Sequence, residues 1–389
     1  MTSQLCAPVG PVAEQAMQIA AQRPTSTLRV VSLIPAHNES ADMGATIEAL
    51  LLQQRRPDLV VVIPNGCTDD TAAIARRYPV TVLELPVLPH KKSEALNIAW
   101  QKYCQDADVV ICLDGDTILP PNAVGDWEQE YLLDRPTGNI SRPLGGSSSK
   151  FTMLGDHFLT RLQRAEFARW TDTALRRGWT SVLAGTGCAI SGDALRTVAA
   201  QDDREGPWTY NSQVEDFELT YAIRRLGYRC QVSPQVRAYT DSMKSVRALW
   251  GQRMKWQCGT VEDLLAIGVN RLTVVDWWQQ IAGLGAALSR LLWVVVVVAQ
   301  IALGQFHFVL FWWFVPVLFA AVDIKAALRI PHRDRKDVVL AALLLPAEFF
   351  SWLRAGWFLA AWFDVLKSKV TGNRKDRWKM QYKAEGLTG

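Results

Sequence analysis

Two aspartates follow an apolar run that reads as a strand, "ADVVICLDGD" at residues 107–116. In an extended segment, residues two apart project to the same side, so Asp114 and Asp116 would converge. Paired carboxylates of this kind hold Mg²⁺ or Mn²⁺ on a diphosphate, and Gly115 lets a phosphate approach the backbone. A solvated Asp-Gly turn explains the motif equally well in isolation. Its position at a strand end favours the metal site.

A second pair of acids and a pair of lysines stand at the starts of helical patterns. Glu215 and Asp216 lie in "VEDFELT", and a carboxylate held near an acceptor hydroxyl can act as a general base. Acids at a helix N-terminus also simply complement the helix dipole, which is the alternative for this motif alone. Lys91 and Lys92 begin "KKSEALN", where they suit an anionic phosphate or form an exposed lysine pair. Asn65 lies in "PNGCTDDT", where it reads a nucleobase edge or only builds the turn.

The elements that must position these groups alternate along the chain from residue 29. Strands are predicted in four apolar runs: "RVVSLIPAHN", "DLVVVIPNG", "VTVLEL" and "ADVVICLDGD". Helices are predicted between them, at residues 41–54, in "TDDTAAIARRY" with Thr68 as its N-cap, and at residues 91–104. This alternation predicts a doubly wound α/β fold with a mainly parallel sheet. Ligands bind such sheets at the carboxyl ends of the strands, where the polar groups fall.

The next region is less regular. Residues 141–150 predict a flexible loop, and residues 151–177 predict a long helix. "LAGTGCAISG" predicts a strand punctuated by glycines. "VEDFELTYAIRRLGY" predicts a helix that Gly227 ends.

The apolar C-terminal part predicts membrane helices. A crossing needs about 20 apolar residues, and residues 281–303 and 306–328 supply two crossings. Residues 338–366 are long enough for a third, but Glu348 and Arg354 interrupt them and basic segments flank both ends. A re-entrant or interfacial helical pair is therefore favoured over a third crossing. Its two charges would pair or face a wet groove rather than lipid.

These patterns predict six parts. They are a tail or short helix at residues 1–28, a cytosolic catalytic domain at 29–243, amphipathic interface helices at 244–276, a transmembrane hairpin at 277–328, the segment at 338–366 and a basic cytosolic tail at 367–389. We expect a multi-pass protein of the plasma or inner membrane, with the lipid bilayer as a partner.

Composition and missing motifs exclude other classes. The net charge of +4 is too small to argue for nucleic acid. Seven cysteines are dispersed without a CxxC pair, which predicts reduced thiols facing the cytosol and no zinc site. "GTGCAISG" lacks the dinucleotide spacing, and the sequence holds neither a Walker phosphate loop nor a Gly-x-Ser-x-Gly elbow. No signal peptide is expected in residues 1–28.

Seven motifs, taken in order, resemble those of one enzyme family. "IPAHNES", "NGCTDDT", "KKSEALN", "LDGD", "GTGCAI", "VEDFELT" and "QRMKW" are similar to motifs of the family 2 inverting glycosyltransferases. The membrane-embedded branch of cellulose, chitin, hyaluronan and poly-N-acetylglucosamine synthases is the best match. The resemblance covers about residues 29–260. It implies a GT-A catalytic domain on the cytosolic side that uses a nucleotide-sugar, expected to be a UDP-sugar, and Mg²⁺ or Mn²⁺.

The resemblance also implies a role for each matching residue. The metal falls to Asp114 and Asp116, and the general base to Asp216 with Glu215 beside it. The nucleotide-sugar is expected to contact Pro35, Ala36, His37, Glu39, Asn65, Lys92 and Asp114. The acceptor is expected to contact Gly185, Thr186, Cys188, Gln252, Arg253, Lys255 and Trp256. Asn65 stands where an acidic residue is usual, and Lys255 where an arginine is usual.

Two functions and one non-enzymatic role compete. The leading interpretation is a processive transferase that extends a cell-surface polysaccharide or oligosaccharide, which the Gln-x-x-Lys-Trp helix favours. The alternative is transfer of one sugar to a lipid carrier or surface glycan, because two spans and one ambiguous segment look thin for a polymer channel. A short product, a homo-oligomer or a partner would remove that conflict. Intact Asp114, Asp116 and Asp216 argue against a non-catalytic scaffold.

Overall fold

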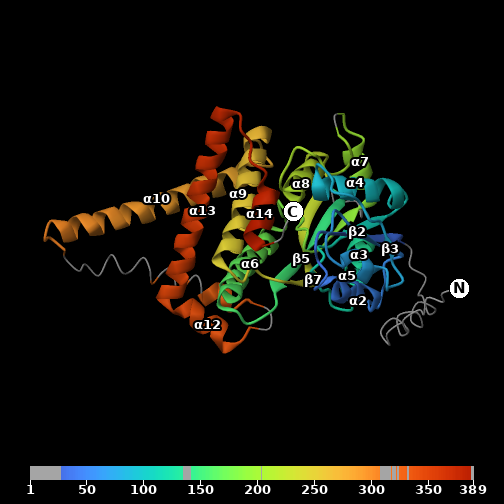
Figure 1. The fold of residues 1–389 in the computed structure, drawn as a ribbon, viewed down its shortest axis with the longest axis horizontal. Helices are drawn as coiled ribbons and strands as arrows, with labels where there is room; N and C mark the ends of the chain where they lie inside the picture. Colours follow the sequence, from blue (N-terminus) through green and yellow to red (C-terminus); the bar gives the residue numbers. More distant parts are fainter. Residues whose placement is uncertain are drawn as a thin grey trace. The chain divides into compact units, whose positions relative to one another are not determined.

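The structure is a computed structural model that describes residues 28–134, 142–202, 204–306, 317, 321, 324–330 and 333–386. The chain forms two compact units (Figure 1). The sheet unit comprises residues 1–151, 174–210 and 215–241, and the helical unit comprises residues 152–173, 211–214 and 242–389.

Seven strands form a single sheet in the order β3-β2-β1-β4-β6-β5-β7. Their bounds are β1 (Val30–Ala36), β2 (Leu59–Pro64), β3 (Thr81–Val82), β4 (Val109–Cys112), β5 (Leu144–Met153), β6 (Cys188–Ser191) and β7 (Arg229–Thr240). β1 pairs in parallel with β2 and β4, and β2 pairs in parallel with β3. β6 runs antiparallel to both β4 and β5. This mixed sheet with its parallel half confirms the predicted fold class.

Helices cover both faces of this sheet. All seven residues of β1 are buried, and their side chains alternate between two cores: Val31 and Leu33 face one, Val30 and Ile34 the other. The first core is completed by α4 (Lys91–Tyr103), α7 (Gly192–Ala199) and α8 (Glu215–Arg225). The second is completed by α2 (Met43–Leu51), α3 (Thr71–Ala75) and α5 (Ala123–Leu133). Figure 1 shows α4, α7 and α8 at the top of the sheet unit and α2 at its bottom.

β5 corrects the loop that we predicted at residues 141–150. Its small residues are buried because the neighbouring side chains leave no room for larger ones: a Cβ on Gly146 would lie 2.3 Å from Leu183 Cδ1. Serine and glycine here are packing residues in a strand, not signs of a loop. The helix predicted at residues 151–177 starts later because β5 continues to Met153, and α6 spans Phe158–Arg177.

Thr68 is not the N-cap that we predicted for the second helix. α3 begins at Thr71, and Asp70 occupies its N-cap position. Asp69 organises the turn before it, because its carboxylate accepts hydrogen bonds from Thr71 N at 3.1 Å and from Ser40 N at 3.0 Å. The turn therefore extends further into the sequence than the helical pattern indicated.

Other boundaries also differ in length. "VTVLEL" contributes only Thr81–Val82 to the sheet, and "LAGTGCAISG" contributes only Cys188–Ser191. α8 ends at Arg225, and Gly227 follows with φ of +93°, a left-handed value that glycine adopts readily. The predicted end of this helix is confirmed.

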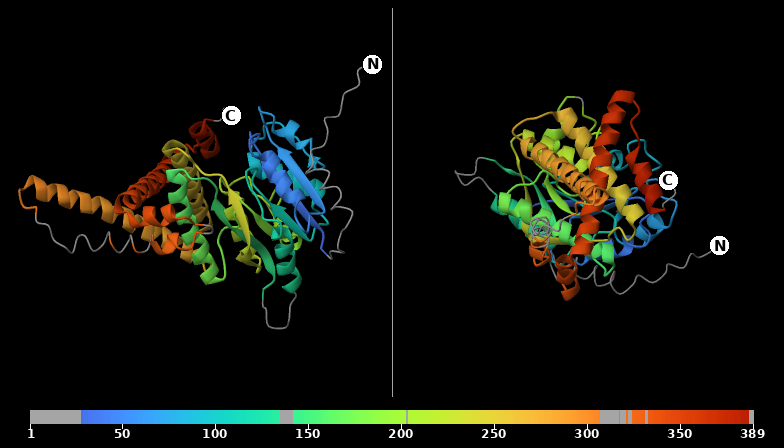
Figure 2. Two further views of the ribbon diagram at one scale, coloured as in Figure 1. Left: turned by 90° about the horizontal axis from the view of Figure 1, so that it is seen from below. Right: turned by 90° about the vertical axis from the view of Figure 1, so that its left-hand side faces the viewer.

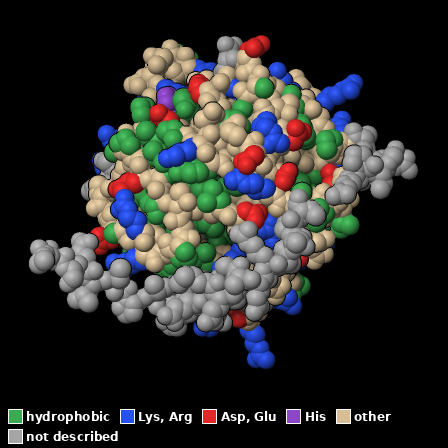
Figure 3. Space-filling model, turned by 90° about the vertical axis from the view of Figure 1, so that its right-hand side faces the viewer, with side chains coloured by type: hydrophobic (Ala, Val, Ile, Leu, Met, Phe, Trp, Pro, Cys, Tyr) green, Lys and Arg blue, Asp and Glu red, His purple; other side chains and the backbone are tan. Residues whose placement is uncertain are grey.

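The face drawn in Figure 3 mixes basic and acidic side chains with hydrophobic ones. Where described residues are visible on this face, the blue side chains form no continuous stripe. A basic stripe is the electrostatic footprint of nucleic-acid binding. The exclusion of nucleic acid stays a prediction.

Three helices enclose the core of the helical unit. They are the first part of α6, α9 (Val246–Ile267) and α13 (Leu344–Thr371). The core comprises Leu159, Leu162, Leu249, Met254, Cys258, Val261, Phe350, Trp357, Ala361 and Val365. A short last helix, α14 (Arg377–Glu385), lies on α9 where Gly251 allows close approach, since a Cβ there would lie 2.7 Å from Ala384 Cβ.

α10 (Val274–Ala302) is long and apolar enough to cross a membrane. Its most apolar stretch of 18 residues has a mean hydropathy of 2.2, and only 6% of that stretch is buried. Figure 2 shows α10 running out from the other helices of the helical unit. α12 (Arg335–Ala342) and α13 together are also long and apolar enough to cross a membrane, but a bend of 72° separates them. A broken crossing and a re-entrant pair are both consistent with this bend. The span predicted at residues 306–328 lies largely outside the described residues.

A charged contact joins α10 to α13. Glu348 of α13 forms an ion pair with Arg290 of α10. Arg354, the other charge predicted to interrupt this segment, lies over the ring of Phe350 at 5.8 Å. An acid and a base on two apolar helices satisfy each other in this way.

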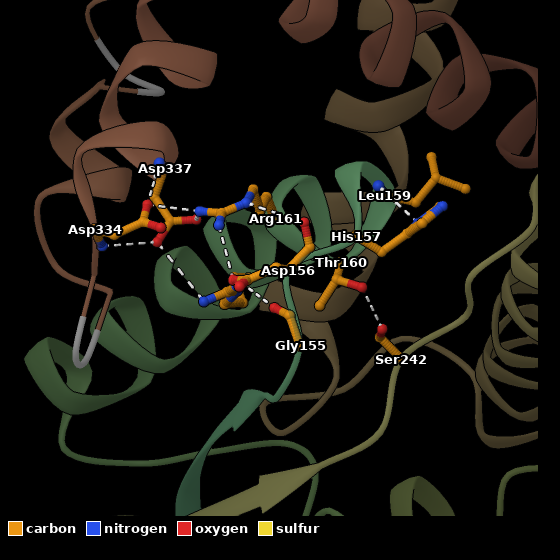
Figure 4. A network of polar contacts seen from close by, with 10 residues as sticks. Gly155, Asp156, His157, Leu159, Thr160, Arg161, Ser242, Asp334 and Asp337 are labelled. Atoms are coloured by element: carbon orange, nitrogen blue, oxygen red, sulfur yellow. Dashed lines mark hydrogen bonds and ion pairs between the residues drawn. The ribbon is translucent and has the colours of Figure 1, made fainter.

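A buried arginine ties α6 to the start of α12 (Figure 4). Arg161 Nη1 lies 2.6 Å from Asp334 Oδ1 and 3.0 Å from Asp337 Oδ1, and its Nη2 lies 2.8 Å from Asp156 Oδ1. The Asp337 side chain is fully buried. Asp334 and Asp337 also form a capping box, in which each side chain accepts the other's backbone N–H.

We predict that Arg161→Met lowers the stability of the protein. The substitution leaves the buried Asp337 carboxylate without its shortest ion pair, and breaking a buried pair from one side costs about 3 kcal/mol. Arg335→Met, which removes an exposed cation from α12, the helix that carries Asp337, is the matched control. Thermal unfolding of the detergent-purified protein checks this; equal melting temperatures for the two variants would contradict it.

Candidate active site

Two polar segments meet at the carboxyl ends of β1 and β2. His37 Nδ1 lies 2.8 Å from Asn65 O, and Asn65 N donates a hydrogen bond to Ala36 O at 2.9 Å. Glu39 N donates to Thr71 Oγ1 at 2.8 Å. Ala36, His37, Glu39 and Asn65, four of the residues predicted to contact a nucleotide-sugar, therefore lie along the carboxyl ends of these two parallel strands.

Asn65 holds an acceptor that no described residue satisfies. The residue is 9% exposed, and its side-chain oxygen is buried without a hydrogen-bond partner in the described part of the chain. A buried unsatisfied polar atom costs about 1–3 kcal/mol. Such an oxygen suits a donor on a ligand, and the N–H of a nucleobase is a donor of this kind.

The two aspartates of the Asp-Gly-Asp motif lie in a turn, not in extended chain as we predicted. Thr117 N donates to Asp114 O at 3.2 Å and closes this turn after β4. Asp116 Oδ2 accepts hydrogen bonds from Thr240 Oγ1 at 2.8 Å and from Asp241 N at 3.3 Å. The orientation of Asp116 is thus fixed by the end of β7 and not by alternation along a strand.

Asp116 carries its charge at a cost. Burial and, after it, the charge of Asp114 raise the pKa of Asp116 from 3.8 to about 6, although the Thr240 hydrogen bond opposes the shift. Among the described residues, no three His, Cys, Asp or Glu side chains gather closely enough to hold a metal ion. The two carboxylates fit Mg²⁺ or Mn²⁺ when a diphosphate and water supply the remaining ligands.

Lys92 bridges two of the predicted site carboxylates. Its Nζ lies 2.7 Å from Asp114 Oδ1 and 2.9 Å from Glu215 Oε1. Burial alone would lower the pKa of Lys92, but these two carboxylates outweigh burial and hold the pKa well above its ordinary value. Gly185 borders the ammonium, since a Cβ there would lie 2.7 Å from Lys92 Nζ. The contact joins α4, the turn after β4 and the start of α8.

Asp216 and this lysine line one pocket of the sheet unit. Its other lining residues are Pro35, Leu96, Cys112, Leu113, Leu183, Gly185, Cys188, Ile190, Trp208, Glu215 and Leu219. Asp216 is half-buried at the start of α8, where Phe217 N donates to its Oδ1 at 2.8 Å. Because Glu215 is engaged by Lys92, Asp216 is the carboxylate of this pair that suits a base.

Two thiols form part of the pocket wall. Cys112 and Cys188 are direct neighbours in the antiparallel pairing of β4 and β6. The hydrogen bond between the thiols, and then burial, hold the pKa of Cys188 well above its ordinary value. A neutral thiol is a poor nucleophile, so Cys188 acts here as an apolar wall. Gly185 and Thr186 lie half-buried in the turn that precedes it.

The remaining predicted acceptor residues lie on α9 in the helical unit. Arg253 is 3% exposed and forms an ion pair with Glu166 at 2.9 Å. Its guanidinium also lies over the rings of Trp256 at 4.4 Å and Phe167 at 5.0 Å. Trp256 is half-buried and meets Phe167 edge-on. These contacts hold α9 against α6, and a role of either residue toward an acceptor stays a prediction.

Lys255, the lysine in the usual arginine position, contacts the last helix. Its Nζ lies 3.1 Å from the ring centre of Trp378 on α14, and the side chain is buried. Gln252 is half-buried, and its Oε1 accepts a hydrogen bond from Arg253 Nη1 at 3.2 Å. The structure thus divides the predicted site residues into one group in the sheet unit and one on α9.

Comparison with known proteins identifies the family. The sequence profile described as "Glycosyltransferase like family 2" matches residues 26–259, more than half of the chain. The chain belongs to this family. The predicted enzyme class, a glycosyltransferase, is thereby confirmed.

The relatives of this glycosyltransferase agree with its fold. It is 24% identical over 259 residues to a poly-beta-1,6-N-acetyl-D-glucosamine synthase of Staphylococcus epidermidis, a match covering 64% of this chain and 56% of that protein. The synthase of Staphylococcus aureus strain COL is 24% identical over 245 residues, covering 61% and 55%. The chain thus spans about half the length of these relatives.

A solved structure supports the fold alone. A mannosyltransferase from Pyrobaculum calidifontis in complex with GDP-Man and Mn²⁺ is similar to this chain with a TM-score of 0.56 and 18% identity. The match covers 91% of this chain and 93% of that one. The predicted GT-A architecture is confirmed.

Two contacts of this glycosyltransferase escaped sequence reasoning. Thr240 orients Asp116 from a point 124 residues further along the chain, and no local pattern marks it. Trp378 lies over Lys255 from the basic tail, which we read as a cytosolic extension. A tryptophan within a strongly charged tail was the available signal for the second contact.

We predict that Lys92→Met disrupts the site more than Lys91→Met. Without the ammonium, Asp114 and Glu215 lose the shared cation that holds them together, and donor affinity should fall about tenfold or more. Titration with a nucleoside diphosphate checks this result. Lys91→Met removes a neighbouring cation of the same helix and is the control; equal losses would show that the bridge is unimportant.

A second prediction concerns metal binding and pH. Burial and Asp114 disfavour the charged form of Asp116 in the fold, so this group's contribution to stability falls as the pH rises from 3.8 through about 6. Because Mn²⁺ binds the ionised form, the rise in melting temperature with Mn²⁺ should be larger at about pH 7.5 than at about pH 5. Asp116→Asn should remove this difference. A metal shift independent of pH would contradict the assignment.

Proposed function

We propose that this chain is a membrane-bound inverting glycosyltransferase that moves a sugar from a UDP-sugar to a hydroxyl of a growing cell-surface glycan. One observation carries the proposal. Lys92 ties Asp114 and Glu215 together at a pocket that Asp216 also lines. A phosphate-binding cation, a metal carboxylate and a base thus belong to one sheet edge.

The reaction follows from the roles of these groups. Asp216 takes the proton of the acceptor hydroxyl, whose oxygen bonds to the anomeric carbon while the bond from that carbon to the diphosphate oxygen breaks. A single displacement of this kind inverts the anomeric centre. Lys92 offers its charge to the diphosphate, and Glu215 keeps the ammonium in place.

Asp114 and Asp116 would hold the divalent metal. A bound Mg²⁺ or Mn²⁺ supplies positive charge to the departing diphosphate. The raised pKa of Asp116 supports this role, because a site that disfavours a second negative charge is relieved by a cation. The metal complexed by the Pyrobaculum calidifontis mannosyltransferase is Mn²⁺, which agrees with this choice.

The nucleobase is proposed to contact Asn65. The buried side-chain oxygen of Asn65 is satisfied by the N–H of a uracil or a guanine. The curated relatives, named for N-acetylglucosamine polymers, favour a UDP-sugar, whereas the solved neighbour holds GDP-Man. Both donors therefore belong in the test.

The proposed membrane helices bear on whether the product is a polymer or a glycan extended by one sugar. α10 is proposed to cross the plasma or inner membrane, with the catalytic domain in the cytosol, and processive synthesis follows the naming of the relatives. Among the described residues, one helix is long and apolar enough to cross a membrane, or two if the bent pair is one span. The second candidate function is transfer of one sugar to a lipid-linked or surface glycan acceptor. A homo-oligomer would supply further membrane helices for polymer export.

The deciding experiment is incubation of purified protein with a panel of UDP-sugars and GDP-mannose in the presence of Mn²⁺. Release of the nucleoside diphosphate identifies the donor, and the product mass shows whether one or many sugars are added. EDTA should stop the reaction, because the diphosphate then lacks its counter-charge. Full turnover in EDTA would contradict the metal assignment.

We predict that Asp216→Asn lowers kcat by about 10²-fold or more and leaves nucleoside diphosphate affinity nearly unchanged. The amide cannot accept the proton, but it keeps the shape of the pocket wall. Asp202→Asn, which changes an exposed acid of the same unit, is the control. Turnover retained by the Asp216 variant would remove this residue as the base.

A further inference from the structure

Four residues, Asn211–Val214, lead directly into Glu215 and Asp216 but belong to the helical unit. Every one of the four is held there. Arg374 Nη2 donates to Asn211 O at 2.8 Å, and Ser212 Oγ donates to Asp263 Oδ2 at 2.7 Å. The lead-in to the proposed base is therefore fixed by contacts that the metal, lysine and pocket residues do not share.

Gln213 is held by both of its amide atoms. Its Nε2 donates to Glu262 Oε2 at 3.0 Å, and its Oε1 accepts from Arg377 N at 2.9 Å. Arg374 Nη2 in turn lies 2.8 Å from Glu262 Oε2. One carboxylate of α9 thus joins the lead-in to the C-terminal segment.

Val214 completes the contact by packing. A Cβ on Gly259 of α9 would lie 2.8 Å from Val214 Cγ1 and 2.9 Å from its Cγ2, so only glycine leaves the valine in its place. Val214 N also donates to Ser212 Oγ at 3.0 Å, which makes the four residues a compact turn. α9 carries Lys255 one turn earlier, and that lysine lies over Trp378.

The C-terminal segment is itself firmly anchored. The Arg377 side chain is 2% exposed and pairs with Asp364 of α13 at 3.1 Å. Lys375 Nζ pairs with the same carboxylate at 3.0 Å. A surface pair such as Arg374–Glu262 contributes little stability by itself. The Arg374–Glu262 pair instead determines position, because the anchored C-terminal segment fixes the location of Arg374.

We propose that residues 374–377, with Glu262 and Gly259 of α9, form a clamp on Asn211–Val214 that positions the base Asp216. This inference rests on the proposed function. Arg374, Glu262 and Gly259 are positioning residues that do not touch substrate. Movement of the C-terminal segment or of α9 then changes the sugar-transfer step without changing how the donor binds. A misplacement of about 1 Å at a reacting group can lower the rate about 10²-fold.

Gly259→Ala tests the clamp from the α9 side. Alanine favours a helix over glycine by about 1 kcal/mol, but its Cβ must displace Val214, and overpacking of this kind costs about 1–3 kcal/mol. We therefore expect a folded variant, assayed well below its melting temperature, whose kcat is lower by about tenfold or more while its nucleoside diphosphate affinity is unchanged. Gly285→Ala in α10, whose Cβ would meet nothing within 4 Å, is the matched control and should keep kcat.

Arg374→Ala tests the clamp from the C-terminal side. Its kcat should fall in the same way, Arg374→Lys should recover part of it, and Lys379→Ala, which removes an exposed cation of α14, should keep it. The proposal is overturned if kcat of both clamp variants stays within about twofold of the wild type, or if the controls lose as much. It is also overturned if nucleoside diphosphate affinity falls in parallel with kcat.

The wild-type protein separates this outcome from a failure of the proposed function. A wild type that transfers no sugar from any donor in the panel, or an active Asp216→Asn variant, contradicts the function itself. An active wild type with an inactive Asp216→Asn variant and fully active clamp variants contradicts only the clamp.

Discussion

The candidate site of the sheet unit depends on one half-buried cation, Lys92. Lys92 joins helix α4, the turn after β4 and the start of α8, three segments that are far apart in the chain. A buried ion pair contributes little net stability compared with apolar packing, but removing one partner is costly because the other charge is left uncompensated. With two carboxylates around one ammonium, each of the three groups has a partner of opposite charge. The lysine also holds the Asp114 and Glu215 side chains close together at the edge where ligands of such sheets bind.

The helical unit uses charge in a different way. Arg161, Arg253 and Arg377 are nearly fully buried, and each has at least one carboxylate partner within the unit. These pairs fix helices whose apolar residues alone would slide, because an ion pair has one geometry and a hydrophobic contact has many. If α10 crosses a membrane as proposed, fixed neighbours of this kind matter there, since lipid offers no hydrophobic force that drives helices together.

The sequence predicted the parallel half of the fold well and the rest less well, for physical reasons. β1 and β2 are buried on both faces, so their unbroken apolar runs were unambiguous. β5 has Gly145 and Gly146 where neighbouring side chains approach, and glycine in a sequence indicates a loop as readily as a crowded strand. The Asp-Gly-Asp spacing predicted that alternation along a strand would orient the carboxylates, whereas a turn and, for Asp116, a hydrogen bond from Thr240 orient them. Partners from distant segments leave no local trace in the pattern.

The direction of β6 separates two halves of the site. β4 runs parallel to β1 and leads from its carboxyl end into the Asp-Gly-Asp turn, whereas β6 runs the opposite way and begins at the same edge, after Gly185–Gly187. Residues that follow a strand and residues that precede one therefore face each other across the pocket. The two loops belong to different connections of the chain, so either can change in length while the other keeps its anchoring strand. Sequence changes in one of these loops can therefore leave the position of the other unchanged.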